Sequence, residues 1–241
     1  MEAVLVVGST GNIGIAAILA ALRSKRQVIA IVRNKAAAEK VYKHAGTKEN
    51  ITCVEADVSR IDGVAGVVEK VKAGELPAFQ HVYAAVGMIP SPAGIHEVDM
   101  KSFEEAMNIS FYADYYAYRA TYQYLVEQGP NSSFTICTGG GGDTGKYGAT
   151  SIAQGALFSF AAVVASEKIP IRFNEVYLCC RVEYDSQCEG AENAWKLRAS
   201  DFGRVYEALL ANADIRDSRV TVKGLADVNE LKYQKKLAGF E

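Results

Sequence analysis

Short apolar runs alternate with segments of helical periodicity along most of the chain. Ala3–Val7 and Gln27–Val32 are almost wholly apolar and rich in β-branched residues, which is typical of strands buried on both faces of a parallel sheet. Between them, over Asn12–Arg23, apolar residues recur at the spacing of one helix face. These three segments predict a βαβ unit at the start of the chain.

The same alternation continues to residue 222. We predict helices over residues 35–44, 64–72, 101–127, 151–167 and 201–212, and strands over 51–55, 81–86, 133–137, 171–178 and 219–222. Strands that alternate with helices in this order predict an α/β fold, a single Rossmann-type doubly wound parallel sheet with helices on both faces. No internal repeat or long Pro/Gly/Ser-rich linker divides the sequence, so we expect one domain over residues 1–241.

The composition is that of a globular protein. Of the 241 residues, 49% are hydrophobic and 22% are charged, and the formal net charge is -2. These fractions exclude the disordered, collagen-like and coiled-coil classes. Because no long run of one charge sign occurs, we expect a small-molecule substrate, and neither nucleic acid nor a membrane as a partner.

The five cysteines and three histidines do not indicate a disulfide framework or a metal site. The cysteines are odd in number and have no CxxC spacing, and the histidines share no spacing typical of metal ligands. We therefore expect no metal. A reducing compartment fits this cysteine usage, and the first apolar run is too short for a signal peptide. The expected location is cytoplasmic.

Three glycines, Gly8, Gly11 and Gly14, lie between the first predicted strand and its helix. Glycines at such a turn let the backbone approach a pyrophosphate, and the helix N-terminus that follows attracts its negative charge. The GxxGxxG spacing differs from the GxGxxG dinucleotide pattern, but the strand and helix around it favour a cofactor loop over a bare turn. The candidate cofactor contacts in this loop are Gly8, Ser9, Thr10, Gly11, Asn12, Ile13 and Gly14.

The end of the second predicted strand indicates which cofactor to expect. A site for NAD(H) usually has Asp or Glu there to bind the ribose 2′-hydroxyl, but this strand is followed by Arg33. A guanidinium presents forked donors that suit a 2′-phosphate. We therefore expect NADP(H), with Arg33 as the ligand of its 2′-phosphate. The alternative is that Arg33 is a solvated surface charge.

Further segments resemble the short-chain dehydrogenase/reductase superfamily over nearly the whole chain. Ala-Asp-Val-Ser at residues 56–59 is similar to the family's adenine-contacting segment, and Ala-Ala-Val-Gly at residues 84–87 stands where the family has Asn-Asn-Ala-Gly. The resemblance also implies that Asn108 holds the water of the family's proton relay. The further cofactor contacts that it implies are Asp57, Val58, Ala85 and Gly87.

In this family a Ser orients the substrate carbonyl, a Tyr donates the proton, and a Lys four residues later lowers the pKa of the Tyr and holds the ribose. The aligned positions in this chain are Thr138, Thr150 and Gln154. An aliphatic hydroxyl cannot replace a phenol of pKa about 10 as the acid, and an amide cannot supply the cation. We keep these three residues and Asn108 as catalytic candidates, but we do not expect the usual proton transfer.

Tyr147, three residues before Thr150, is the candidate for a substitute acid. If the helix predicted from residue 151 begins one turn earlier, Tyr147 and Thr150 lie on one helix face, and the phenol reaches the proton-donor position with Lys146 beside it. The alternative is that Lys146 and Tyr147 belong to a glycine-flanked loop without a catalytic role.

A different substrate would remove the need for an acid. An iminium ion is already cationic and accepts hydride without a protein proton donor, while ring closure or isomerisation needs mainly a shaped pocket. Because it lacks this Tyr and Lys, the chain resembles divergent members of the family in fungal secondary-metabolite biosynthesis. Some of those members combine or replace reduction with cyclisation. Three functions stay open: an atypical oxidoreductase for a carbonyl or an iminium, a non-redox cyclase or isomerase that keeps the nucleotide as a scaffold, and a non-catalytic nucleotide sensor.

Two predicted helices indicate self-association. Residues 112–124 contain six tyrosines, and residues 152–164 are apolar on more than one face. In the family that this chain resembles, the first of these helices lies in the oligomer interface, and aromatic side chains are enriched in interfaces. We expect a homodimer or a homotetramer.

Overall fold

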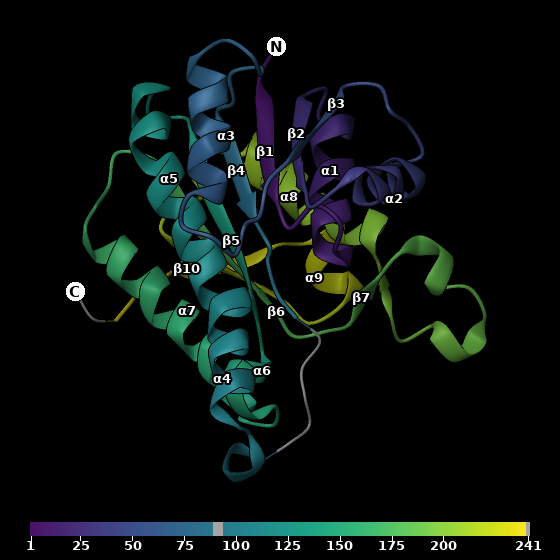
Figure 1. Cartoon of the computed structure of the whole chain (residues 1–241). Helices are drawn as coiled ribbons and strands as arrows, with labels where there is room; N and C mark the ends of the chain where they lie inside the picture. Colours follow the sequence, from purple (N-terminus) through teal and green to yellow (C-terminus); the bar gives the residue numbers. More distant parts are fainter. Residues whose placement is uncertain (89–93, 240–241) are drawn as a thin grey trace.

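The fold is built on one eight-stranded sheet (Figure 1). The computed structural model describes residues 1–88 and 94–239. The strands of the sheet are β1 Ala3–Val7, β2 Gln27–Val32, β3 Ile51–Glu55, β4 His81–Ala84, β5 Ser133–Gly139, β6 Arg172–Leu178, β9 Ser218–Val222 and β10 Lys232–Lys235. Their spatial order is β10-β9-β6-β5-β4-β1-β2-β3, and all neighbours are parallel except β9 and β10.

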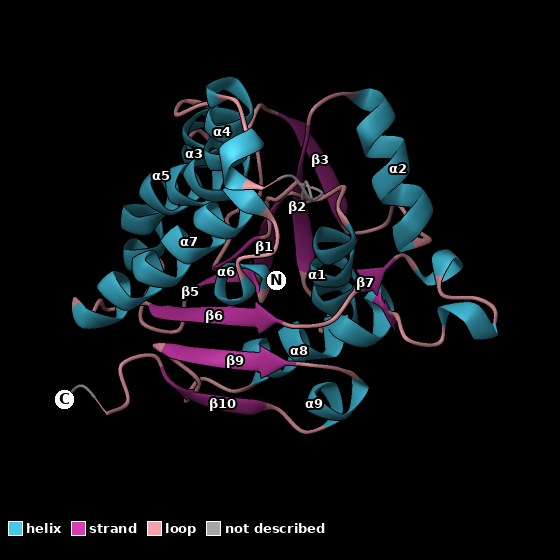
Figure 2. Cartoon of the chain, turned by 90° about the horizontal axis from the view of Figure 1, so that it is seen from below, coloured by secondary structure: helices cyan, strands magenta, loops and turns pink. Residues whose placement is uncertain are grey.

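Helices cover both faces of the sheet (Figure 2). One face carries α1 Asn12–Arg23, α2 Lys35–Ala45, α8 Ala199–Ala211 and α9 Leu225–Asn229, and the other carries α3 Gly63–Lys72, α5 Ala113–Glu127 and α7 Gly148–Ser166. Helix α4, Met100–Met107, packs against α7, and the short helix α6, Gly141–Thr144, follows β5. The predicted α/β fold class is therefore confirmed.

The central strand shows why the apolar runs form this sheet. All five residues of β1 are buried. Val4 and Val6 pack in the core beneath α1 and α8, whereas Leu5 and Val7 pack in the core beneath α3 and α5. A strand covered on both faces has no polar side, which explains its continuous apolar sequence.

The order of the strands creates a crevice at the carboxyl ends of the central strands β1 and β4. From β1 the chain winds through β2 to β3, and it then returns to β4 on the other side of β1 before continuing to β5 and β6. At such a reversal, the connections that leave the carboxyl ends of β1 and β4 run to opposite sides. The turn after β1, which carries the three glycines, lies at this crevice.

The helix predicted over residues 101–127 is not one regular α-helix. The segment is helical throughout, but a π-helical turn, Asn108–Tyr112, separates α4 from α5. The sequence analysis treated this segment as one continuous helix and did not identify the turn, and such turns are frequent at functional sites. The predicted boundary of α7 was also wrong, since this helix begins at Gly148, three residues before residue 151.

The sequence analysis missed three strands and one helix near the end of the chain. Strand β10 is polar and exposed along its whole length, and it pairs with β9 through main-chain groups. The ribbon of β7, Val182–Glu183, and β8, Leu197–Arg198, has two residues in each strand. Helix α9 has only five residues. Elements this short or this polar lack the periodic apolar pattern on which the prediction rested.

Helix α7 is the one helix of the described residues that is long and apolar enough to cross a membrane by length and composition. Several of its side chains, Leu157, Ala161 and Val164 among them, are buried in the core over β5 and β6. Packing on the sheet thus accounts for part of its apolar composition, whereas Ile152 and Val163 are exposed.

Candidate functional site

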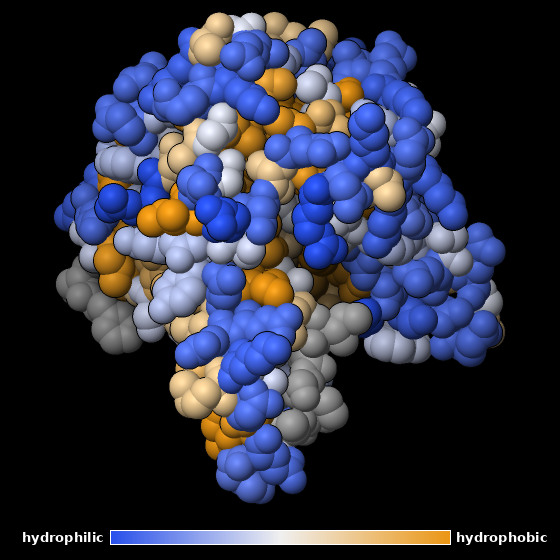
Figure 3. Space-filling model, viewed as in Figure 1, coloured by the Kyte–Doolittle hydropathy of each residue, from blue (hydrophilic) through white to orange (hydrophobic). Residues whose placement is uncertain are grey.

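A cavity of about 840 Å³ opens at the carboxyl ends of β1, β2 and β4. Figure 3 shows a recess here, between the lobe that carries β7 and the projection that carries α4, with apolar residues inside it. The volume lies in the range of cofactor and small-molecule pockets. The described lining includes every residue from Gly8 to Ile13 and, on other elements, Arg33, Asp57, Val58, Ala85 and Gly87. The cavity therefore brings together the cofactor residues predicted from sequence, with Gly14 immediately behind the loop.

The glycine loop needs glycine at two of its three positions. Gly8 has φ +86, and a Cβ on it would lie 2.6 Å from the carbonyl oxygen of Ala85. A Cβ on Gly14 would lie 2.2 Å from the carbonyl oxygen of Gly8. The backbone therefore folds back on itself and on β4 at the start of α1, whose first-turn N–H groups have no intrahelical acceptor. This arrangement can hold an anionic group such as a pyrophosphate.

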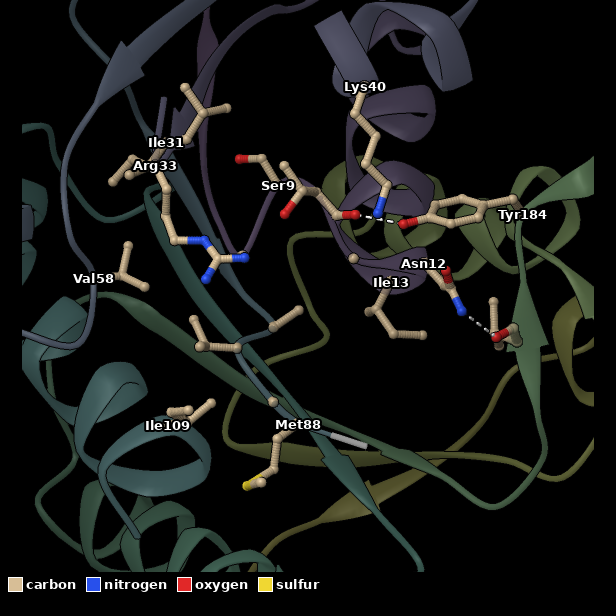
Figure 4. A pocket seen from close by; sticks show the side chains of 18 of the residues that line it. Ser9, Asn12, Ile13, Ile31, Arg33, Lys40, Val58, Met88, Ile109 and Tyr184 are labelled. Carbon is tan, nitrogen blue, oxygen red and sulfur yellow. Dashed lines mark hydrogen bonds between the residues drawn. The ribbon is translucent and has the colours of Figure 1, made fainter. Parts of the chain in front are cut away.

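One end of the cavity is basic. Figure 4 shows the guanidinium of Arg33, from the end of β2, and the ammonium of Lys40, from α2, both directed into it. Asp57 is an acid at this end, and it accepts hydrogen bonds from the hydroxyl (2.6 Å) and the N–H (3.0 Å) of Ser59. These bonds lower the pKa of the Asp57 carboxyl. The Lys40 ammonium lies 5.1 Å from the centre of the Tyr184 ring. Arg33 is the cavity-lining cation that acts on the engaged Asp57 carboxylate, and its guanidinium suits a further phosphate.

The opposite end of the cavity is apolar. It is lined by Val86, Gly87 and Met88 after β4, by Ile109 of the π-helical turn, and by Leu178 and Cys180 after β6. Burial raises the pKa of the Cys180 thiol to about 11, so the thiol is neutral at physiological pH. None of these six residues carries a charge, whereas Arg181 and Glu183, which follow Cys180, also line the cavity. We call this part of the cavity the apolar end.

Thr138, at the position of the family's Ser, is buried and is not among the described residues that line the cavity. Its hydroxyl donates to Oε1 of Glu175 on the neighbouring strand β6, at 2.8 Å. The same carboxylate accepts from Arg219 at 2.9 Å and 3.0 Å and from Lys236 at 2.5 Å. Burial lowers the pKa of the Lys236 ammonium, and the ion pair with Glu175 partly offsets this. Thr138 thus belongs to a buried polar cluster.

Thr150 and Gln154 lie on the first turns of α7 but do not line the cavity in the described part of the chain. Thr150 is buried. The side-chain oxygen of Gln154 accepts a hydrogen bond from the N–H of Gly139 at 2.7 Å, which ties α7 to the end of β5. At the position of the family's Lys, the chain therefore has a neutral side chain that supports the backbone.

Tyr147 and Asn108, the other two catalytic candidates, are also outside the described cavity lining. Tyr147 precedes the first residue of α7, its ring lies over Gly141, and the residue is 38% exposed. Its N–H donates to the hydroxyl of Ser151 at 3.0 Å. Asn108 is half-buried at the start of the π-helical turn. None of the five catalytic candidates is among the described residues that line the cavity, and their roles stay predictions.

The structure adds functional residues that the sequence analysis did not identify. Asp114 is fully buried at the start of α5, where its Oδ1 accepts from the N–H of Val86 at 3.3 Å and its Oδ2 has no partner among the described residues. Burial raises the pKa of this carboxyl to about 8. A second addition is the segment after β6, in which Glu183 and Tyr184 line the cavity. The sequence signal for Asp114 was that an acid stands within an aromatic helix. No sequence signal pointed to Glu183 or Tyr184.

Comparisons with known proteins agree with these observations. A family model described as short chain dehydrogenase matches residues 2–180. The short-chain dehydrogenase/reductase iacG of the fungus Pestalotiopsis fici is 42% identical over 239 residues, which is 98% of this chain and 96% of that protein.

Two solved structures share the fold. An alcohol dehydrogenase from the archaeon Thermococcus sibiricus, complexed with 5-hydroxy-NADP, matches with a TM-score of 0.78 at 17% identity, over 92% of this chain and 96% of its own. A short chain oxidoreductase from Pseudomonas aeruginosa containing an atypical catalytic center matches with a TM-score of 0.77 at 16% identity, over the same shares. With the family model covering most of the chain and a full-length relative at 42% identity, this protein belongs to the short-chain dehydrogenase/reductase family.

Proposed function

We propose that this protein binds NADP(H) in the cavity and reduces a small organic substrate, a carbonyl compound or an iminium ion, without a tyrosine acid. One observation carries the proposal. A single cavity combines a glycine loop and two cations with the apolar end, and Tyr147 is not among the described residues that line it. The family's Tyr and Lys positions hold Thr150 and Gln154, which lie outside that lining.

The chain's own residues fit the cofactor. The backbone around Gly8 and Gly14 leaves no room for a Cβ, as expected where a backbone turn closes tightly beside a pyrophosphate. Arg33 would pair with the 2′-phosphate, assisted by its forked donors. Asp57 and Val58 would border the adenine, and Ala85 and Gly87 would border the nicotinamide. When bound, the reduced cofactor supplies a hydride.

The apolar end favours a substrate that needs no protein acid. An iminium carbon is electrophilic without protonation, so the protein needs only to hold it near the cofactor and exclude water. The same surroundings suit ring closure, so a cyclase or isomerase that keeps the nucleotide as a scaffold is the second candidate. The fungal relative, which is described as a short-chain dehydrogenase/reductase, supports the reductase over the cyclase.

Titrations of NADPH and NADH, followed by screening for turnover, test the proposal. We expect NADPH to bind more tightly than NADH, and Arg33→Ala to reduce this preference about tenfold or more, the value of a charge-assisted contact. An unchanged preference would remove Arg33 from the 2′-phosphate site. Substrate-dependent NADPH oxidation identifies a reductase, and turnover without oxidation identifies a cyclase or isomerase. If NADPH binds tightly but no substrate is turned over, a non-catalytic nucleotide sensor is the one of the three functions that remains.

We also propose that the protein is a homodimer or homotetramer built on α5 and α7. Tyr112 before α5 and Ile152 and Val163 on α7 are large apolar side chains exposed to solvent. Self-association through these helices would cover them. Light scattering at tens of micromolar protein should give a multiple of the 26.0 kDa chain mass, and Val163→Glu should lower it. A monomeric wild-type protein at that concentration contradicts this interface.

A further inference from the structure

Hydrogen bonds connect the segment after β6 to the glycine loop beside the cavity. Tyr184 donates its hydroxyl hydrogen to the carbonyl oxygen of Thr10 at 2.5 Å. The side-chain amide of Asn12 donates to the carbonyl oxygen of Val182 at 3.0 Å and to Oε2 of Glu183 at 2.6 Å. Figure 4 shows these contacts between Asn12, Tyr184 and their partners beside the cavity. They bring residues 182–184 against the first turn of α1.

Glu183 is the acidic member of this arrangement. Its side chain is 13% exposed and lines the cavity. Oε2 accepts from Asn12, and Oε1 accepts from the guanidinium of Arg181 at 2.7 Å. A carboxylate has about four lone-pair directions, so each oxygen retains the capacity for another donor.

A carboxylate at this place needs an explanation. The first turn of α1 and the glycine loop attract anions, and a dinucleotide places its pyrophosphate there. A second negative charge beside the pyrophosphate weakens binding unless its partner Arg181 or hydrogen bonds from the ligand offset it. On the nicotinamide side of the pyrophosphate, a dinucleotide offers such donors: the ribose hydroxyls and the carboxamide N–H₂. Carboxylates bind ribose hydroxyls in other dinucleotide sites.

The residues at the family's Tyr and Lys positions leave that half of the cofactor without its usual support. Gln154 is occupied by the N–H of Gly139, and Thr150 is buried outside the cavity lining. We propose that Glu183, held in place by Asn12 and Arg181, binds the nicotinamide half of the cofactor by accepting hydrogen bonds from its ribose or carboxamide. The inference rests on the proposed function, since it requires a nicotinamide dinucleotide in the cavity.

Binding of two nucleotides tests this role without any substrate. NADPH contains the nicotinamide half, whereas adenosine 2′,5′-bisphosphate has only the adenosine half with its 2′-phosphate. Isothermal titration of both ligands into wild type, Glu183→Ala and Glu183→Gln compares the two halves. We expect Glu183→Ala to weaken NADPH about tenfold or more and to change the bisphosphate less than twofold. Glu183→Gln keeps an acceptor oxygen, and we expect a smaller loss of at least threefold for NADPH alone.

Two control variants separate this inference from the proposed function. Glu189→Ala removes an exposed acid from the same segment outside the cavity, and both affinities should stay unchanged. Arg33→Ala should weaken both ligands, since both carry the 2′-phosphate. If wild type binds neither ligand, the proposed function fails and this inference with it. If wild type binds both ligands, the inference is overturned when the Glu183 variants lose affinity for both ligands equally, or when they gain affinity for both. Either result would mean that Glu183 acts on the phosphates. If Glu183→Ala does not fold, the Glu183→Gln result decides.

Discussion

Thr138 on β5 donates its hydroxyl hydrogen to Glu175 on β6 at 2.8 Å, and Glu175 is 1% exposed. A threonine hydroxyl has one hydrogen, so in this arrangement Thr138 has none for a substrate carbonyl. The carboxylate is in turn held by Arg219 and Lys236, which come from β9 and from the segment after β10. The residue at the family's Ser position is therefore bound into a buried ion-pair cluster.

We expect Thr138→Val to destabilise the protein by about 1.5 to 3 kcal/mol, because one buried hydrogen bond to a charged acceptor is lost at nearly constant shape. NADPH affinity should stay within twofold, since Thr138 does not line the described cavity. Urea unfolding and NADPH titration measure the two effects. Thr52→Val, an exposed threonine on β3, is the control and should be nearly neutral. A tenfold loss of NADPH affinity in Thr138→Val would instead mean that Thr138 contacts the cofactor.

Restoring the family pair should not restore the family chemistry. Lysine has no acceptor atom, so Gln154→Lys leaves the N–H of Gly139 unpaired, at a cost of about 1 to 3 kcal/mol. Thr150→Tyr adds a ring at a buried position and overpacks it. We expect the double variant to unfold at lower urea concentration and to gain no activity, whereas Gln154→Glu, which keeps an acceptor, should lose less stability. A tenfold rise in substrate-dependent NADPH oxidation in the double variant would contradict the non-standard route.

Tyr147→Phe tests whether a tyrosine outside the usual position supplies the proton. The hydrogen bond that Tyr147 makes uses its backbone N–H, which the substitution retains, and its ring can still cover Gly141. We therefore expect turnover to change less than about threefold, where an acid role predicts roughly 100-fold. Tyr112→Phe, at an exposed tyrosine before α5, is the matched control. A loss near 100-fold with NADPH still bound would identify Tyr147 as the acid.

Asp114 should make stability depend on pH. Burial raises the pKa of its carboxyl from the usual 3.8 to about 8 in the folded protein. The folded state therefore retains a proton that the unfolded chain has lost, and this favours unfolding progressively as pH rises from about 4 to 8. Asp114→Asn removes the effect, so the stability of this variant relative to wild type should increase over the window, with a slope of at most about 1.4 kcal/mol per pH unit.

Urea unfolding at several pH values measures this difference. A relative stability that does not vary between pH 4 and 8 would mean that the carboxyl titrates in the folded protein as it does in the unfolded chain. Because His81 is also buried, with its pKa lowered to about 4 by desolvation, the comparison must be made between variant and wild type. The contribution of His81 is common to both proteins and cancels.

The order of elements and the position of the cofactor loop were determined by the sequence itself. A strand covered on both faces needs consecutive apolar residues, and a helix on a sheet needs an apolar stripe, so both leave local patterns such as Val4 to Val7 and Asn12–Arg23. The glycines are also a local requirement, because Gly14 is crowded by the backbone of Gly8 within the same turn. Arg33 could be found because it directly follows a recognisable strand.

The partners of polar side chains were decided only by the tertiary structure. Thr138 and Glu175 are 37 residues apart in sequence, and Asn12 and Glu183 are 171 apart. A local pattern shows that a residue is polar, but not whether strand register brings a cation or an acceptor to it. The π-helical turn before α5 is a similar case, since the sequence analysis placed one continuous helix over the segment that contains it. Hydrogen bonds act over about 3 Å, so they depend on how distant segments pack, whereas burial of apolar surface depends on the type of each residue.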